Sequence, residues 1–150
     1  MKQIGNGLVA WTEEEIIKRE NISNLLVYKV RSVLYKINSA IQVFRVETPC
    51  LIDQKCATGH LPFYKIDTRY VLRGEITRGT YFIQDQMQYK LPVCLYQVNK
   101  SFRDERSEAI RPSKLRYREF WQIEFQLFYS PDTKADYHKL FVENFKGFGQ

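Results

Sequence analysis

The stretch EFWQIEFQLF, residues 119–128, divides by alternate positions into two unlike sets of side chains. Successive side chains of a β-strand point to opposite faces of a sheet. One face of this strand is therefore apolar and belongs in the core, with Trp121, Ile123, Phe125 and Leu127. The opposite face, extended to the residues just before the stretch, carries polar groups and one ring: Arg116, Arg118, Phe120, Gln122, Glu124 and Gln126.

A second β segment, residues 93–103, is predicted to pair with the segment 115–129 as an antiparallel partner across a basic loop. Its alternation places apolar side chains on one side and Gln97, Asn99, Ser101, Arg103 and Glu105 on the other. An antiparallel sheet with one solvated face produces such a pattern without any function. The content of this polar face nevertheless matches what is needed to hold a phosphate, stack a base and bind an ammonium group.

A long helix is predicted near the N-terminus. The sequence Thr12-Glu13-Glu14-Glu15 has the capping-box pattern, so the helix begins at Glu13 and extends to about Ser39. Apolar residues then recur every three or four positions, which is typical of one buried helix face. These residues are Leu26, Val30, Val33, Leu34, Ile37 and Ile41.

Shorter elements are predicted along the rest of the chain. Residues 42–48 alternate and are rich in β-branched side chains, which favours a strand. Pro49 ends this strand because proline cannot donate a hydrogen bond to a sheet. Asp132 is expected to cap the last helix. The other predicted elements are a strand pair within 61–72, a helix over 75–89 and a helix over 131–145.

The predicted fold class is α+β, a mainly antiparallel sheet flanked by helices. We expect one domain over 1–150, with a helical part over 1–40, a sheet over 41–130 and a C-terminal helix over 131–150. The chain has 44% hydrophobic and 15% aromatic residues, enough for a real core, and its apolar runs are far too short to span a membrane. Without a signal-peptide pattern, we expect a soluble, cytoplasmic protein.

The cysteines and histidines do not indicate a metal site. Cys50, Cys56 and Cys94 show no metal-knuckle spacing, and His60 and His138 have no ligand partner at a recognisable spacing. We therefore expect reduced, inert thiols and no metal held by the protein itself.

The formal net charge of +6 favours polyanionic partners. Between Lys100 and Arg118 there are seven basic and three acidic residues, so most of the excess lies in the basic loop. This loop is either a solvated charge run or a binding site for phosphates. Its candidate nucleic-acid contacts are Arg106, Arg111, Lys114 and Arg116.

The segment Ser101–Glu105, the loop and the segment Arg116–Glu124 together resemble motif 2 of the class II aminoacyl-tRNA synthetases, most closely that of glycyl-tRNA synthetases. Three further segments resemble the family in the same order along the chain. They are Val46–Pro49, similar to the end of motif 1; Ala57–His60, similar to a small-Ser/Thr-Gly-His stretch; and Leu72–Glu75 with Gly79, similar to a Leu-Arg-Pro-Glu segment before a glycine-containing helix. The resemblance covers about 44–129.

The resemblance implies a truncated class II catalytic core that binds ATP, accompanied by Mg²⁺ as counter-ion. Arg103 would be the catalytic group that grips the α-phosphate of ATP while an adenylate forms. Phe120 would stack on adenine, with Glu105 and Arg118 also in the ATP site. The implied amino-acid contacts are Arg73, Glu75, Gln122 and Glu124, and glycine is favoured as the amino acid. In the family, the motif 1 proline, here Pro49, marks a homodimer interface.

This sequence departs from the family at several points. Gly74 replaces the usual proline, the loop before Arg116 is longer, and neither a motif 3 nor an anticodon-binding domain is recognisable in the chain. Three hypotheses follow. The chain activates a small amino acid, completed by a second chain that supplies motif 3; it is an inactive paralogue that binds tRNA or another nucleic acid, as polymerase accessory subunits do; or it is a dimeric structural or regulatory subunit.

Overall fold

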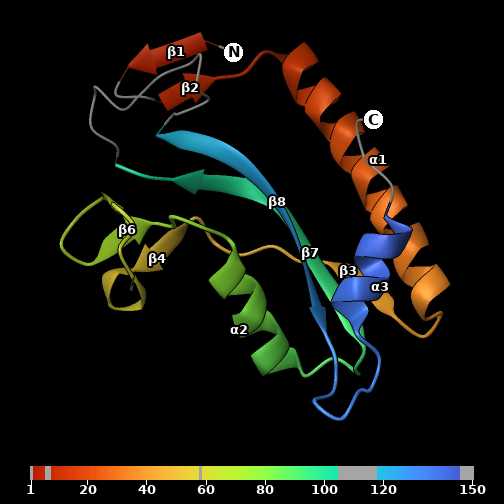
Figure 1. Ribbon diagram of the computed structural model, residues 1–150. Helices are drawn as coiled ribbons and strands as arrows, with labels where there is room; N and C mark the ends of the chain where they lie inside the picture. The colour runs from red at the N-terminus through yellow and green to blue at the C-terminus, as the bar shows by residue number, and fades with distance from the viewer. Residues whose placement is uncertain (1, 6–7, 58, 105–117, 146–150) are drawn as a thin grey trace.

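The computed structural model describes residues 2–5, 8–57, 59–104 and 118–145, with side chains from residue 10 onward. Its elements follow one another along the chain as shown in Figure 1. They are β1 (Lys2–Gly5), β2 (Leu8–Ala10), α1 (Glu13–Ile37), β3 (Gln42–Arg45), β4 (Leu51–Asp53), the 3₁₀ helix η1 (Gln54–Cys56), β5 (Tyr64–Lys65), β6 (Tyr70–Leu72), α2 (Thr77–Met87), β7 (Val93–Phe102), β8 (Glu119–Phe128) and α3 (Tyr137–Asn144).

The central sheet has the strand order β3–β7–β8. Strands β7 and β8 are antiparallel over their whole length, from the pair Val93 and Phe128 to the pair Phe102 and Glu119, as the sequence predicted. Strand β3 runs parallel to β7. Two small antiparallel sheets, β4–β6–β5 and the β1–β2 hairpin, complete the described strands. This mixture of helices and mainly antiparallel strands confirms the predicted α+β class.

Helix α1 begins where the capping box predicted. The Glu15 N–H donates to Thr12 Oγ1 at 3.2 Å, and the Thr12 N–H donates to Glu15 Oε2 at 3.0 Å. The predicted apolar stripe is buried, with Val30 and Leu34 packed against Cys94 and α3. Helices α1 and α3 thus cover the apolar face of β7 and β8 (Figure 1).

Helix α2 lies on the other face of the central sheet (Figure 1). Ile83 and Tyr89 pack there against the fully buried Val93 and Leu95 of β7. The same face of the sheet is therefore apolar at the start of β7, under α2, and polar toward its end. None of the helices among the described residues is long and apolar enough to cross a membrane.

Several predicted boundaries were wrong. Strand β3 ends at Arg45 rather than at Pro49. The backbone leaves the sheet before the proline because the Thr48 N–H donates to the Gln97 side chain instead of to a strand. The hairpin β1–β2 and strand β4 were not predicted.

The cap of the last helix was also wrong, because Asp136 rather than Asp132 caps α3. The Asp136 carboxylate accepts the Lys139 N–H at 3.1 Å. Asp132 instead lies in a turn, where its N–H donates to Ser130 Oγ and the Thr133 N–H donates to the Ser130 carbonyl. A turn held by Ser130 therefore separates β8 from the helix.

Candidate functional site

The predicted polar face of β7 and β8 is present, because polar residues lie opposite one another in the strand register. Gln97 pairs with Glu124, Asn99 with Gln122, and Ser101 with Phe120. The fully buried Ser101 hydroxyl donates to Gln122 Oε1 at 2.6 Å. Residues directly opposite in an antiparallel pair project to the same side. The two strands therefore place amide, aromatic and carboxylate side chains on one surface.

Arg103 lies just beyond the end of β7 and next to Phe120. Its Cζ atom is 5.0 Å from the centroid of the Phe120 ring. Its backbone N–H donates to the Arg118 carbonyl at 2.9 Å, and its Nε donates to the Gly74 carbonyl at 3.1 Å. The guanidinium of Arg103 is half-buried. Of its N–H groups, only the one on Nε has an acceptor among the described residues. The planar Nη donors beside an aromatic ring suit an oxyanion next to a base.

The two predicted amino-acid carboxylates meet at Thr77, the first residue of α2. The Thr77 hydroxyl donates to Glu124 Oε2 at 2.6 Å. The Thr77 N–H donates to Glu75 Oε2 at 3.1 Å, and the Arg78 N–H donates to Glu75 Oε1 at 3.3 Å. Glu75 therefore caps α2, where a negative charge is favourable. The structure brings together Glu75 and Glu124, which the sequence places 49 positions apart.

Arg73 is only 3% exposed and contacts the protein's own backbone. Its Nε donates to the Lys100 carbonyl at 2.6 Å, and its Nη1 donates to the Thr48 carbonyl and to Thr48 Oγ1. Its Nη2 donates to Cys50 Sγ at 3.3 Å. Burial lowers the pKa of this guanidinium. These contacts are those of a scaffold residue that joins β7 to the segment after β3, rather than those of a residue that lines a pocket.

Gln97 organises the base of the polar face, and sequence reasoning did not single out this role. It is fully buried, and its Oε1 accepts the Thr48 hydroxyl at 2.8 Å and the Thr48 N–H at 3.1 Å. Its Nε2 donates to the Ile76 carbonyl and to Thr80 Oγ1, both at 3.4 Å. The available signal was one amide side chain inside the otherwise apolar run 93–98, since a buried polar group needs hydrogen-bond partners.

Two glycines allow α2 and the segment before it to lie close to the segments around Thr48 and Leu61. A Cβ on Gly79 would lie 2.6 Å from Thr48 Cγ2. A Cβ on Gly74 would lie 2.9 Å from Leu61 Cδ1, and the Gly74 carbonyl accepts the Arg103 Nε. Gly74, which replaces the proline of the synthetase pattern, is thus buried beneath Leu61 and in direct contact with the candidate phosphate-binding arginine.

The remaining predicted site residues are placed only in part. Arg118 is half-buried, with its Nε 3.9 Å from Asp104 Oδ1. Pro49 is exposed, beside the Thr48 that Arg73 and Gln97 hold. Five predicted residues lie outside the described part of the chain, namely Glu105, Arg106, Arg111, Lys114 and Arg116.

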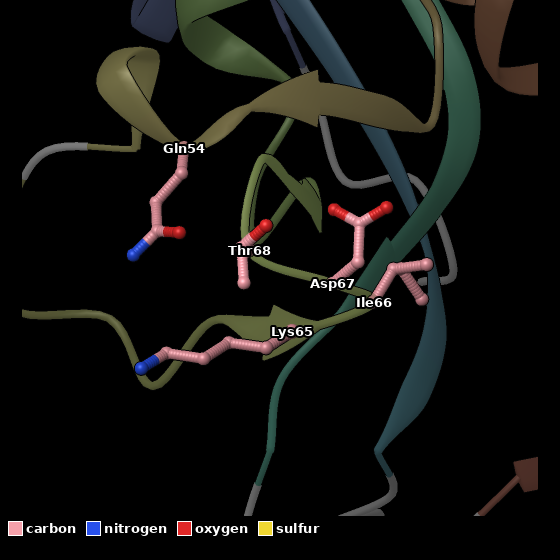
Figure 2. A pocket seen from close by; sticks show the side chains of 5 residues that line it. All are labelled: Gln54, Lys65, Ile66, Asp67 and Thr68. Carbon is pink, nitrogen blue, oxygen red and sulfur yellow. The ribbon is translucent and has the colours of Figure 1, made fainter.

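A surface hollow of about 610 Å³ lies at the turn between β5 and β6 (Figure 2), and none of the residues that line it was predicted for the site. Its lining residues are Gln54, Lys65, Ile66, Asp67 and Thr68. The Asp67 carboxylate accepts the N–H groups of Tyr70 and Arg69, which lowers the pKa of Asp67. The Asp67 carboxylate therefore stabilises the turn. The candidate site is the polar face of β7 and β8.

The chain is similar to known proteins in part of its sequence and in its fold. No protein-family model matches the chain. A glycine–tRNA ligase of Mycoplasma capricolum subsp. capricolum is 35% identical over an alignment of 83 residues. The match covers 51% of this chain and 17% of the relative. The chain thus matches only about a sixth of the length of that relative.

Solved structures show the fold. A protein described as an ATP phosphoribosyltransferase regulatory subunit/histidyl-tRNA synthetase, from Bacillus halodurans, superposes with a TM-score of 0.60 at 17% identity, over 85% of this chain and 32% of its own. The RNA-binding domain of threonyl-tRNA synthetase from Cryptosporidium parvum superposes with a TM-score of 0.60 at 18% identity. The superposition covers 87% of this chain and 34% of the neighbour. The chain has the fold of a class II aminoacyl-tRNA synthetase core and is similar in sequence to part of a glycine–tRNA ligase.

Proposed function

We propose that the polar face of β7 and β8 binds ATP and a small amino acid, with glycine favoured, and joins them as an aminoacyl-adenylate. One observation carries the proposal. Arg103 and Phe120 lie together at one end of this face, and Glu124 and Glu75 lie together farther along it. Phe120 and Glu124 are four residues apart on one strand, a span of about 13 Å. This spacing separates a nucleotide subsite from an ammonium subsite on a single surface.

The chemistry of adenylate formation needs positioned charges rather than a protein nucleophile. The amino-acid carboxylate attacks the α-phosphorus of ATP, a new carboxyl–phosphate bond forms, and pyrophosphate leaves. Arg103 would bind the α-phosphate where negative charge develops, and Phe120 would stack on the adenine. Glu75 and Glu124 would hold the ammonium group, with Gln122 beside them. Mg²⁺ would accompany ATP as its counter-ion.

The wider biology belongs to the same proposal. We place the activity in the cytoplasm and infer a homodimer that uses the surface around Pro49. The basic residues of the loop would contact tRNA, with Glu105 and Arg118 at the ATP site. A second chain that supplies motif 3 would complete the enzyme. Similarity to part of a protein named glycine–tRNA ligase supports the combination of glycine and tRNA.

A second candidate function is that of an inactive paralogue that binds nucleic acid. The net charge of +6 and the basic residues of the loop favour it. Affinity would then fall steeply with salt and depend on Arg106, Arg111 and Lys114 rather than on Glu124.

The test is amino-acid-dependent exchange of labelled pyrophosphate into ATP, measured with each standard amino acid. We expect exchange with glycine, reduced about 100-fold or more in Arg103→Ala, because one donor to a developing oxyanion contributes on that scale. Arg45→Ala is the matched control, since Arg45 is an exposed arginine of the same sheet. Absence of amino-acid-dependent exchange by the wild-type chain, or equal activity of the two variants, would overturn the proposal.

A further inference from the structure

We infer that Thr77 is a positioning residue that fixes both carboxylates of the ammonium subsite. The inference rests on the proposed function and adds a residue that the sequence analysis did not single out. Thr77 is half-buried at the first turn of α2, between the end of the β6 segment and the middle of β8. Among the residues that the structure describes, no other residue donates hydrogen bonds to both Glu75 and Glu124.

The two hydrogen bonds of Thr77 are different in kind. Its hydroxyl reaches across to β8 and donates to Glu124 Oε2 at 2.6 Å, the short distance typical of a hydroxyl bound to a carboxylate. Its backbone N–H donates to Glu75 Oε2 at 3.1 Å. A substitution of the side chain therefore releases Glu124 and leaves the hydrogen bond to Glu75 in place.

The arrangement leaves capacity on both carboxylates. Among the described residues, Thr77 is the only hydrogen-bond donor to Glu124, and it binds Oε2, so Oε1 can accept from a ligand. Each oxygen of Glu75 accepts one backbone N–H and has a second lone pair. A primary ammonium group has three donors and suits two fixed carboxylates. The geometry thus orders both acids before a ligand arrives, which reduces the entropy lost on binding.

A purely structural role for Thr77 makes a different prediction. If the hydroxyl only joined α2 to β8, its loss would lower the thermal stability and would affect both substrates alike. If it positions Glu124, its loss weakens recognition of the amino group and leaves the nucleotide subsite around Arg103 and Phe120 unchanged. The KM for glycine and the KM for ATP therefore distinguish the two roles.

The experiment compares Thr77→Val, which removes the hydroxyl at nearly constant volume, with Thr77→Ser, which retains it. We expect Thr77→Val to raise the KM for glycine about tenfold to hundredfold, the scale of one hydrogen bond to a charged group, with the KM for ATP within about twofold of wild type. Thr77→Ser should restore the KM for glycine. Thr68→Val, the same change at an exposed threonine in the turn before β6, should leave the KM for glycine unchanged.

The outcomes separate this inference from the function on which it rests. Wild-type exchange with an unchanged KM for glycine in Thr77→Val would overturn the positioning role alone. An equal rise of the KM values for glycine and ATP would also overturn it, since that result indicates a structural defect. A wild-type chain that shows no amino-acid-dependent exchange would overturn both proposals.

Discussion

Two arginines that the sequence placed in one site have different surroundings in the structure. Arg73 follows the last residue of β6, and Arg103 follows the last residue of β7. The two strand ends lie side by side, because the Phe102 N–H donates to the Arg73 carbonyl at 2.9 Å. Arg73 is 3% exposed and donates to two backbone carbonyls, a hydroxyl and a thiol. Arg103 is half-buried, and its side chain donates to a described residue through Nε alone.

This difference shows that an arginine side chain can either stabilise a fold or keep donors available for a ligand. A guanidinium has five N–H donors, and burial without acceptors is costly. At Arg73 the chain itself supplies acceptors from Thr48, Cys50 and Lys100, so the residue joins segments that are distant in sequence. At Arg103 the Nη donors have no acceptor in the described part of the chain. An oxyanion would supply it.

Removing each arginine is the strongest test of this comparison. We expect Arg73→Leu to lower the free energy of unfolding by about 3 kcal/mol or more, because it leaves the Thr48 and Lys100 carbonyls unsatisfied in the interior. Arg103→Leu, the matched change at the half-buried arginine, should lower it by about 1 kcal/mol or less. Urea unfolding of both variants measures the difference. Similar losses would show that Arg103 is also a scaffold residue.

Local patterns predicted much of the fold. The capping box at Thr12 and Glu15 located the start of α1, and period-two alternation located β7, β8 and their shared polar face. Long-range choices were not predictable in this way. The parallel pairing of β3 with β7 depends on the path between them, and Asp132 lost the role of cap to Asp136 because a turn at Ser130 delays α3.

The residue types of the candidate site were predictable from the sequence, but the separate roles of its residues were not. The resemblance to synthetase motifs placed Arg103 at the α-phosphate of ATP and Arg73 among the amino-acid contacts of the same candidate site. Burial separates them, and burial of Arg73 depends on where Thr48 and Cys50 lie, which no local pattern reveals. Thr77 and Gln97 were not singled out for the same reason, since their roles come from partners across the sheet or in another element.

A smaller loss of stability is expected from overpacking the contact between α2 and Thr48, which Arg73 binds. In Gly79→Ala, the new Cβ would lie 2.6 Å from Thr48 Cγ2 and 2.9 Å from Thr48 Oγ1. Thr48 cannot move easily, because Gln97 and Arg73 both bind it. Overpacking costs about 1–3 kcal/mol, and alanine returns about 1 kcal/mol of helix propensity. We therefore expect a net loss of up to about 2 kcal/mol in urea unfolding.

Thr48→Ser provides the control for the glycine variant. It removes the methyl group that the new Cβ would meet and keeps the hydroxyl that Gln97 and Arg73 bind. The double variant Gly79→Ala with Thr48→Ser should therefore regain part of the stability lost in Gly79→Ala. A greater loss in the double variant would locate the clash elsewhere, and the close approach of α2 to Thr48 would no longer explain the glycine.

The smallest expected effect concerns the contact between Arg103 and Phe120. A double-mutant cycle of Arg103→Ala and Phe120→Ala should give a coupling free energy of about 0.5–1 kcal/mol for an arginine 5.0 Å from a ring centroid. Arg69, in the turn before β6, and Tyr70 of β6 form the matched pair, with the Arg69 Cζ atom 4.9 Å from the centroid of the Tyr70 ring. If Arg103 binds a phosphate and Phe120 stacks on adenine, saturating ATP changes the first coupling and leaves the second unchanged. Equal couplings with and without ATP in both pairs would assign Arg103 and Phe120 to the scaffold, beside Arg73.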